Sequence, residues 1–160
     1  MDAWIGLGAN LGARRATLEA ALDALRLLPR TRLVARSRLW ASAPVDATGP
    51  DYLNAVARLD TLLDAHELLA ALQAIEARFG RERAYRNAPR TLDLDLLLAG
   101  DATIDTPPPH ALVVPHPRLH ERAFVLRPMA DIDADIVVPG RGPVRQCLAL
   151  VADQRCRPWP

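Results

Sequence analysis

Two aspartates, Asp93 and Asp95, stand two residues apart in a leucine-rich run that follows Pro89 and Arg90. Side chains alternate along a strand, so both carboxylates are predicted to share one face while Leu92, Leu94, Leu96 and Leu98 line the other. Neighbouring carboxylates repel and are costly to bury unless a cation lies between them. Mg²⁺ suits this arrangement, because proteins usually hold it with one or two carboxylates plus substrate phosphates. An edge strand with a polar outer face is the alternative.

Four arginines occupy the short segment in front of these aspartates: Arg81, Arg83, Arg86 and Arg90. An arginine-rich loop is usually a solvated surface. Beside a metal-binding carboxylate pair, however, planar guanidinium groups are suited to hold a polyphosphate. Phosphoryl-type transfer depends on positioning and charge neutralisation, so such a site requires no nucleophile from the protein.

The composition excludes several other chemistries. All twenty basic residues are arginine, so a P-loop lysine and a Schiff-base lysine are both absent from the sequence. A formal net charge of +1 argues against broad nucleic-acid binding. No His/Cys cluster has zinc spacing, and no Gly-x-Ser-x-Gly element supports a hydrolase triad.

The cysteines and the lengths of the apolar runs predict a cytoplasmic protein that is not in a membrane. Cys147 and Cys156 show no metal-ligand spacing, and we interpret them as free thiols. The apolar runs are too short to span a bilayer, and no secretory signal is visible at the N-terminus.

The hydrophobic pattern predicts alternating strands and helices in the first two thirds of the chain. Apolar residues recur with period two in the strands and at helical spacing in the helices, one of which begins with a capping box at Asp64 and Glu67. The expected order is a strand at 4–8, a helix at 18–28, strands at 31–40 and 52–61, a helix at 64–80 and a strand from 92.

This β-α-β-β-α-β order favours an α+β fold, a ferredoxin-like sandwich in a single domain spanning 1–160. A proline-rich stretch at 100–117 follows, with additional C-terminal helices expected at 119–128 and 143–153. The glycines at 6–12 resemble a dinucleotide-binding loop, but their spacing is wrong for that motif. We interpret them as a tight turn between strand and helix.

Four motifs occur in the order that is typical of the 6-hydroxymethyl-7,8-dihydropterin pyrophosphokinases of the folate pathway, and the chain resembles this family almost end to end. The motifs are Gly8-Ala9-Asn10-Leu11-Gly12, Pro50-Asp51-Tyr52-Leu53-Asn54-Ala55, Pro89-Arg90-Thr91-Leu92-Asp93-Leu94-Asp95 and Val114-Pro115-His116-Pro117-Arg118. The third motif is the most specific of them.

The resemblance implies a monomeric enzyme that uses ATP as co-substrate and transfers its β,γ-pyrophosphoryl unit to the hydroxymethyl oxygen of the pterin, releasing AMP. Two Mg²⁺ ions are implied at Asp93 and Asp95, in agreement with the charge argument above. Arg83 and Arg86 lie in the segment that the family uses as a mobile catalytic loop.

The family pattern assigns three overlapping sets of residues. The implied catalytic set is Arg81, Arg83, Arg86, Arg90, Asp93 and Asp95. The implied ATP-binding set is Gln73, Arg81, Arg90, Leu96, His116 and Arg122, with adenine read largely by backbone. The implied pterin-binding set is Ser42, Ala43, Val45, Tyr52, Asn54, Asp95 and Phe124. In this set, Asn54 binds the polar edge of the ring, and Tyr52 and Phe124 contact its two faces. The backbone at 42–45 completes the pocket.

The sequence departs from the family pattern at Asn87-Ala88, where many relatives carry Trp-Gly. Two other functions remain open at this point. A different metal-dependent phosphotransferase explains the aspartates and arginines, but not Tyr52, Asn54 and Phe124. A non-catalytic small-molecule sensor of similar fold has no need of a metal site beside four arginines. An RNA-binding sheet is disfavoured, because exposed aromatic residues on adjacent central strands are lacking.

Overall fold

The computed structural model describes residues 1–10, 12–43, 51–80 and 92–160. The strands are β1 (Asp2–Ala9), β2 (Thr31–Arg36), β3 (Trp40–Ser42), β4 (Tyr52–Thr61), β5 (Asp93–Ala99), β6 (Ile104–Thr106), β7 (Leu112–Val114), β8 (Val137–Val138), β9 (Gly142–Pro143) and β10 (Cys156–Pro158). The helices are α1 (Arg14–Arg26), α2 (Ala65–Arg78), α3 (Ala123–Asp133) and α4 (Val144–Ala149), with a 3₁₀ turn η1 at Leu119–Glu121.

The main sheet contains six strands, in the order β10-β3-β4-β1-β5 with β2 as a further partner of β4. All its pairings are antiparallel. Strand β4 pairs with β1 along one side, and on its other side it pairs with β3 near its start and with β2 near its end. The combination of helices with an antiparallel sheet confirms the α+β class expected from the sequence.

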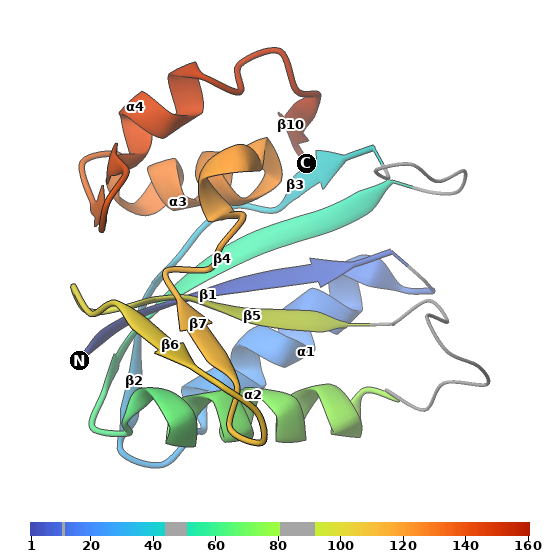
Figure 1. Ribbon diagram of the computed structural model, residues 1–160. Coiled ribbons are helices and arrows are strands. Elements are labelled where there is room, and N and C mark those ends of the chain that lie inside the picture. Colours follow the sequence, from blue (N-terminus) through green and yellow to red (C-terminus); the bar gives the residue numbers. More distant parts are fainter. Residues whose placement is uncertain (11, 44–50, 81–91) are drawn as a thin grey trace.

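Helices α1 and α2 cover one face of this sheet, which we call the lower face (Figure 1). Alternate residues of β1 and β4, including Ile5 and Leu59, pack there against Leu22 of α1 and Leu72 of α2. The capping box predicted for α2 is present: the Glu67 N–H donates to Asp64 Oδ1 at 2.8 Å, and the Asp64 N–H donates to Glu67 Oε1 at 3.1 Å.

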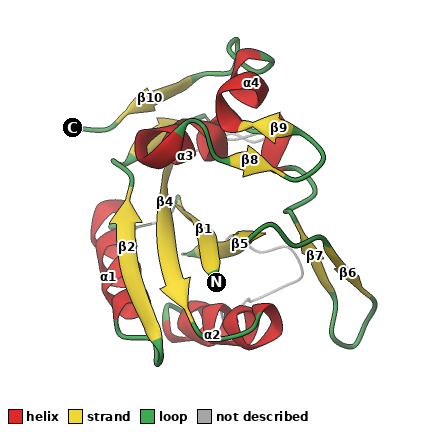
Figure 2. Ribbon diagram, turned by 90° about the vertical axis from the view of Figure 1, so that its left-hand side faces the viewer, coloured by secondary structure: helices red, strands yellow, loops and turns green. Residues whose placement is uncertain are grey.

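Helices α3 and α4 lie on the opposite, upper face (Figures 1 and 2). A second core forms there, where Trp4 of β1 and Val56 of β4 pack with Leu126 and Met129 of α3. The two cores use alternate residues of the same strands, which is the period-two pattern recognised in the sequence. The two predicted C-terminal helices are thus present, at 123–133 and 144–149.

The single strand expected at 31–40 is wrong, because the chain forms two strands there. Arg36 pairs with Ala57 and Trp40 pairs with Asn54, so four steps along one chain match three along the other. The extra residue separates β2 from β3, and β2 itself is irregular between Leu33 and Ala35. The Ser37 hydroxyl supports the break by accepting the Val56 N–H at 2.9 Å and donating to the Arg38 carbonyl at 2.7 Å.

The alternation predicted for the strand after Pro89 is correct at Leu92, Leu94 and Leu96, which enter the lower core, and wrong at Leu98. A bulge pairs Ile5 with Leu96 and Trp4 with Leu98, so Leu98 reaches the upper core instead. The proline-rich stretch also contains an unpredicted antiparallel ribbon formed by β6 and β7.

Both cysteines are free thiols, as expected from the sequence. Within the described ranges, no helix combines the length and the apolar character needed to cross a bilayer.

Candidate active site

One row of the sheet brings together residues that the sequence placed in two different binding sets. Gly8 of β1 pairs with Asn54 of β4 on one side and with Asp93 of β5 on the other. Register partners in a sheet project to the same face, so the Asn54 amide and the Asp93 carboxylate both rise on the upper face. Gly8 has no side chain, and the floor between them is bare backbone.

The second aspartate lies one row further along β5, on the same face. Asp95 pairs with Gly6, which is itself paired with Val56. Asp93 and Asp95 are both half-buried. The prediction that these two carboxylates share one face of a strand is therefore confirmed.

The peptide between the two aspartates is held from the side by α2. The Leu94 N–H donates to Oε2 of Glu76 at 3.0 Å, and the Glu76 side chain is buried. Among the described strands, β5 is at the edge of the main sheet, so no other described strand of that sheet accepts its outward N–H groups. Glu76 supplies the acceptor for the N–H of Leu94, the residue between the two aspartates.

Ser42 and Tyr52 extend the site beyond Asn54. Ser42 pairs with Tyr52 in the register of β3 and β4, and it accepts a 2.8 Å hydrogen bond from Nδ2 of Asn54. Both Ser42 and Asn54 are buried, whereas Tyr52 is partly exposed. Tyr52 and Asn54 share a face, as the strand pattern predicted.

His116 approaches Asp95 from the segment between β7 and η1. The backbone N–H of His116 donates to the Leu97 carbonyl at 2.9 Å, and this bond attaches the segment to β5. Burial lowers the pKa of His116 below 6.5; nearby Asp95 opposes this effect, while Arg122 and Arg118 add to it. The imidazole is therefore neutral at pH 7. Its Nδ1 accepts the Arg118 N–H at 3.2 Å, so its proton is on Nε2.

Arg122 and Phe124, predicted to bind ATP and the pterin respectively, lie at the start of α3. Arg122 is the N-terminal flanking residue of the helix, and its guanidinium carbon lies 5.5 Å from the centre of the Phe124 ring. Phe124 packs at the margin of the upper core and stays partly exposed. This stacking orients both side chains at the same end of α3.

The remaining predicted residues are less informative. Gln73 is exposed on α2, Ala43 is exposed after β3, and the Leu96 side chain points into the lower core, which leaves only its backbone for a ligand. The five other predicted residues lie outside the described ranges: Val45, Arg81, Arg83, Arg86 and Arg90.

The donor set on β5 fits magnesium better than zinc. Within the described part of the chain, no group of three or more His, Cys, Asp or Glu side chains could hold a metal ion. Two half-buried carboxylates beside bare glycine backbone provide oxygen donors and leave room for further ligands. Proteins generally hold Mg²⁺ with one or two carboxylates, and water and substrate phosphates complete its octahedral shell.

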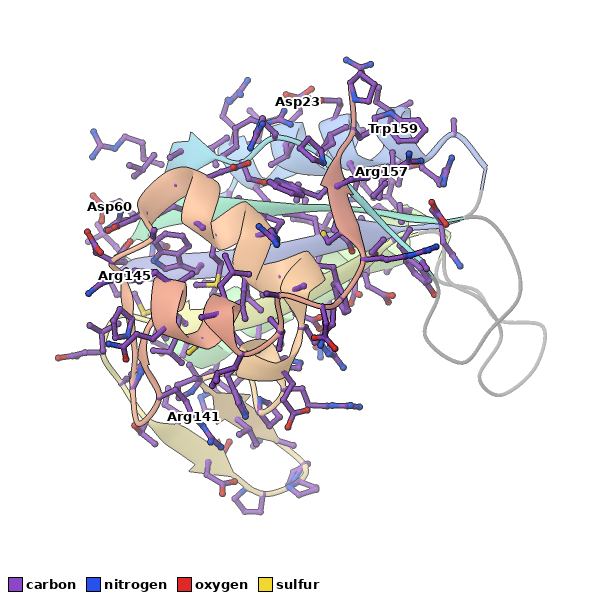
Figure 3. All side chains as sticks on the ribbon, turned by 90° about the horizontal axis from the view of Figure 1, so that it is seen from above. Asp23, Asp60, Arg141, Arg145, Arg157 and Trp159 are labelled. Carbon is purple, nitrogen blue, oxygen red and sulfur yellow. The ribbon has the colours of Figure 1, made fainter. Side chains whose placement is uncertain are left out.

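A separate hollow of about 550 Å³ lies at the start of α1. Its described lining includes Arg14, Leu53 and Trp159, and Leu53 faces the lower core, away from Asn54. Trp159 lies beside the blue helix α1 in Figure 3, after Arg157 of β10. Of the predicted site residues that the structure describes, none lines this hollow.

The sequence interpretation did not predict that Gly8 lies between Asn54 and Asp93, nor that Glu76, which it placed near the nucleotide and the pterin, accepts the Leu94 N–H. Gly6 and Gly8 alternate along β1 with side chains that enter the lower core. This pattern indicates that the upper face of β1 has no side chains at these two positions. Glu76 occupies an inner position of an amphipathic helix, where a carboxylate needs a buried donor.

Comparison with known proteins decides the family. Residues 4–134 match the family of 7,8-dihydro-6-hydroxymethylpterin-pyrophosphokinases, abbreviated HPPK. The chain belongs to this family. The resemblance inferred from the four motifs is therefore confirmed.

Individual HPPK relatives are similar over most of their length. The chain is 50% identical to a 2-amino-4-hydroxy-6-hydroxymethyldihydropteridine pyrophosphokinase of Pseudomonas aeruginosa over 85% of this chain and 83% of the relative. It is 40% identical to the enzyme of the same name from Haemophilus influenzae, over 97% of this chain and 96% of the relative.

Solved structures share the fold at low sequence identity. An HPPK-DHPS of Plasmodium falciparum superposes with a TM-score of 0.73 at 12% identity, covering 95% of this chain. The chain spans 45% of the length of that solved chain. The HPPK fold thus matches almost all of the protein.

Proposed function

We propose that this HPPK transfers pyrophosphate from ATP to the hydroxymethyl group of 6-hydroxymethyl-7,8-dihydropterin, with release of AMP, in tetrahydrofolate biosynthesis. Membership of the family supports this reaction. The observation that supports it here is the row formed by Asn54, Gly8 and Asp93, because the amide proposed to bind the ring and a carboxylate proposed to bind metal lie on the same face of adjacent strands.

Asp93 and Asp95 are the proposed ligands of two Mg²⁺ ions. When bound, these ions neutralise the triphosphate and activate the pterin hydroxyl, which is how paired metals assist transfer between oxygens. The two carboxylates fix where the reacting oxygens meet. Glu76 holds the peptide between them through the Leu94 N–H.

The acceptor pocket is proposed on the other side of Gly8. Asn54 hydrogen-bonds the polar edge of the pterin, and Tyr52 and Phe124 contact its two faces. Backbone of Ser42, Ala43 and Val45 completes the pocket. A planar heterocycle with a polar rim requires this combination of aromatic faces and a few directed polar groups.

The ATP site is proposed between β5, α2 and the start of α3. Neutral His116 donates from Nε2 to a phosphate oxygen, and Arg122 pairs with phosphate charge. Arg81 and Arg90 bind the triphosphate, Arg83 and Arg86 join them as it reacts, and Gln73 and the Leu96 backbone contact the nucleoside. The role of the four arginines rests on the sequence motif.

We also propose a cytoplasmic monomer with one domain over residues 1–160. Both helical layers share one sheet, which supports the single-domain assignment. A ferredoxin-like classification is proposed as well, since β5, β1, β4 and β2 adjoin in that order with α1 and α2 on one face.

The reaction is tested by incubating the protein with ATP, Mg²⁺ and 6-hydroxymethyl-7,8-dihydropterin and separating the nucleotides by chromatography. We expect AMP, formed only when the pterin is present. Formation of ADP, or AMP formation independent of the pterin, would contradict the proposal.

A further inference from the structure

The Asn54 amide is held by a hydrogen bond at its nitrogen end, and its oxygen end lies against the backbone of Gly8. At one end, Nδ2 donates a 2.8 Å hydrogen bond to Oγ of Ser42. Asn54 is 5% exposed and Ser42 is 6% exposed, so water does not compete effectively for this bond.

At the other end, Oδ1 lies over the backbone of Gly8. A Cβ built at Gly8 would be 3.3 Å from this oxygen. The amide nitrogen therefore points toward β3 and the amide oxygen toward β1, on the side where Asp93 rises from the next strand. The side chain presents an acceptor, rather than a donor, to that part of the floor.

We propose that the Ser42 hydroxyl is a positioning residue for the acceptor substrate: it keeps Asn54 in the rotamer whose oxygen receives an N–H group from the polar edge of the ring. This inference rests on the proposed function, and it assigns a role to the Ser42 side chain in addition to its backbone. A freely rotating amide presents its oxygen and nitrogen in turn, and the wrong orientation places two donors against the ring N–H.

Ser37 provides a matched structural control. It is also a buried serine whose hydroxyl bonds to β4, accepting the Val56 N–H at 2.9 Å. Its bond is to the backbone and not to Asn54. Loss of either hydroxyl removes a buried hydrogen bond to β4, and loss of the Ser37 hydroxyl also removes its bond to the Arg38 carbonyl, but only loss of the Ser42 hydroxyl releases the amide.

The test is calorimetric titration with 6-hydroxymethyl-7,8-dihydropterin in the presence of Mg²⁺ and a non-hydrolysable ATP analogue. For Ser42→Ala we expect pterin binding weaker by on the order of tenfold, the size of one net hydrogen bond, with affinity for the ATP analogue unchanged. Ser42→Thr keeps the hydroxyl and should bind within about twofold of wild type. Ser37→Ala should lower the melting temperature without changing pterin affinity.

A double-mutant cycle shows whether Ser42 acts through Asn54. If it does, Ser42→Ala added to Asn54→Ala has no further effect on pterin affinity, because the group it orients is already gone. Additive losses would overturn the proposal, and so would pterin binding by Ser42→Ala within twofold of wild type. If wild type itself does not bind the pterin, it is the proposed function that fails.

Discussion

The Leu94 N–H and the Glu76 carboxylate are joined by a 3.0 Å hydrogen bond. Leu94 is the residue between Asp93 and Asp95, and Glu76 is buried on α2. Helix α2 thereby holds strand β5 at the position between the two proposed metal ligands.

Replacing Glu76 by alanine should destabilise the protein and weaken its response to magnesium. The Leu94 N–H would lose its buried acceptor, which costs about 1–3 kcal/mol in the free energy of unfolding. Urea unfolding gives that loss, and the Mg²⁺ concentration for half-maximal activity should rise. Glu76→Gln retains an acceptor oxygen and should recover most of both properties. Wild-type magnesium dependence in Glu76→Ala would contradict a positioning role.

Gly8→Ala should separate binding from stability. Alanine is favoured over glycine within a strand by about 0.5–1 kcal/mol, which offsets the close contact with Asn54, so thermal stability should stay near that of wild type. The new Cβ, however, would lie 3.3 Å from Asn54 Oδ1 and on the floor of the proposed pterin pocket. We expect a higher KM for the pterin with little change in the KM for ATP. An equal change in both constants would place Gly8 outside the acceptor pocket.

Asp131 should make stability depend on acid pH. Burial alone would raise its pKa, but hydrogen bonds from Arg38 and Trp40 outweigh burial and hold the pKa below 3.8. A depressed folded-state pKa adds stability above pH 3.8, and this stability is lost as the pH falls through the folded-state value. Asp131→Asn should therefore be less stable than wild type near neutrality, by about 1–3 kcal/mol, with the difference shrinking toward low pH.

Asp135 is the control for that measurement. Its side chain is 78% exposed and pairs with Arg145, which is labelled in Figure 3. An exposed ion pair contributes about 0–1 kcal/mol, so Asp135→Asn should follow the wild-type stability curve at every pH. A wild-type curve for Asp131→Asn as well would show that the contacts from β3 to α3 do not depend on this charge.

Asp95→Asn should lose turnover while retaining the acceptor pocket. Removal of one carboxylate charge weakens Mg²⁺ binding, since hard cations need anionic oxygen. We expect activity to fall by at least about a hundredfold, which is the scale set by losing one main electrostatic stabiliser. Pterin affinity in a titration without metal should fall much less than turnover, because Asn54, Tyr52 and Phe124 remain in place. Full activity at ordinary magnesium concentration would refute the assignment of this ligand.

The sequence was most informative where local pattern and tertiary structure agree. Period-two alternation identified β4 with its observed bounds, and the Asp64 capping box correctly marked the start of α2. The break at Ser37 and the displacement of Leu98 arise from bulges, which add a residue to one strand without a change in composition. Local sequence cannot reveal a register that depends on the partner strand.

The candidate site shows the same division. Asp93, Asp95 and Asn54 were identified from residue type and motif, because metal binding and ring recognition require those groups. Gly8 as the shared floor depends on the pairing of three strands far apart in the chain. Glu76 as an anchor depends on how α2 packs against β5, which helical periodicity alone does not specify.

The transfer of an intact pyrophosphoryl group is best followed by ³¹P NMR of the complete reaction with ATP, Mg²⁺ and 6-hydroxymethyl-7,8-dihydropterin. We predict that the ATP resonances are replaced by one AMP resonance and a pair of coupled resonances from a diphosphate ester of the pterin. ADP together with a pterin monophosphate would show transfer of a single phosphoryl group and would contradict the proposed reaction.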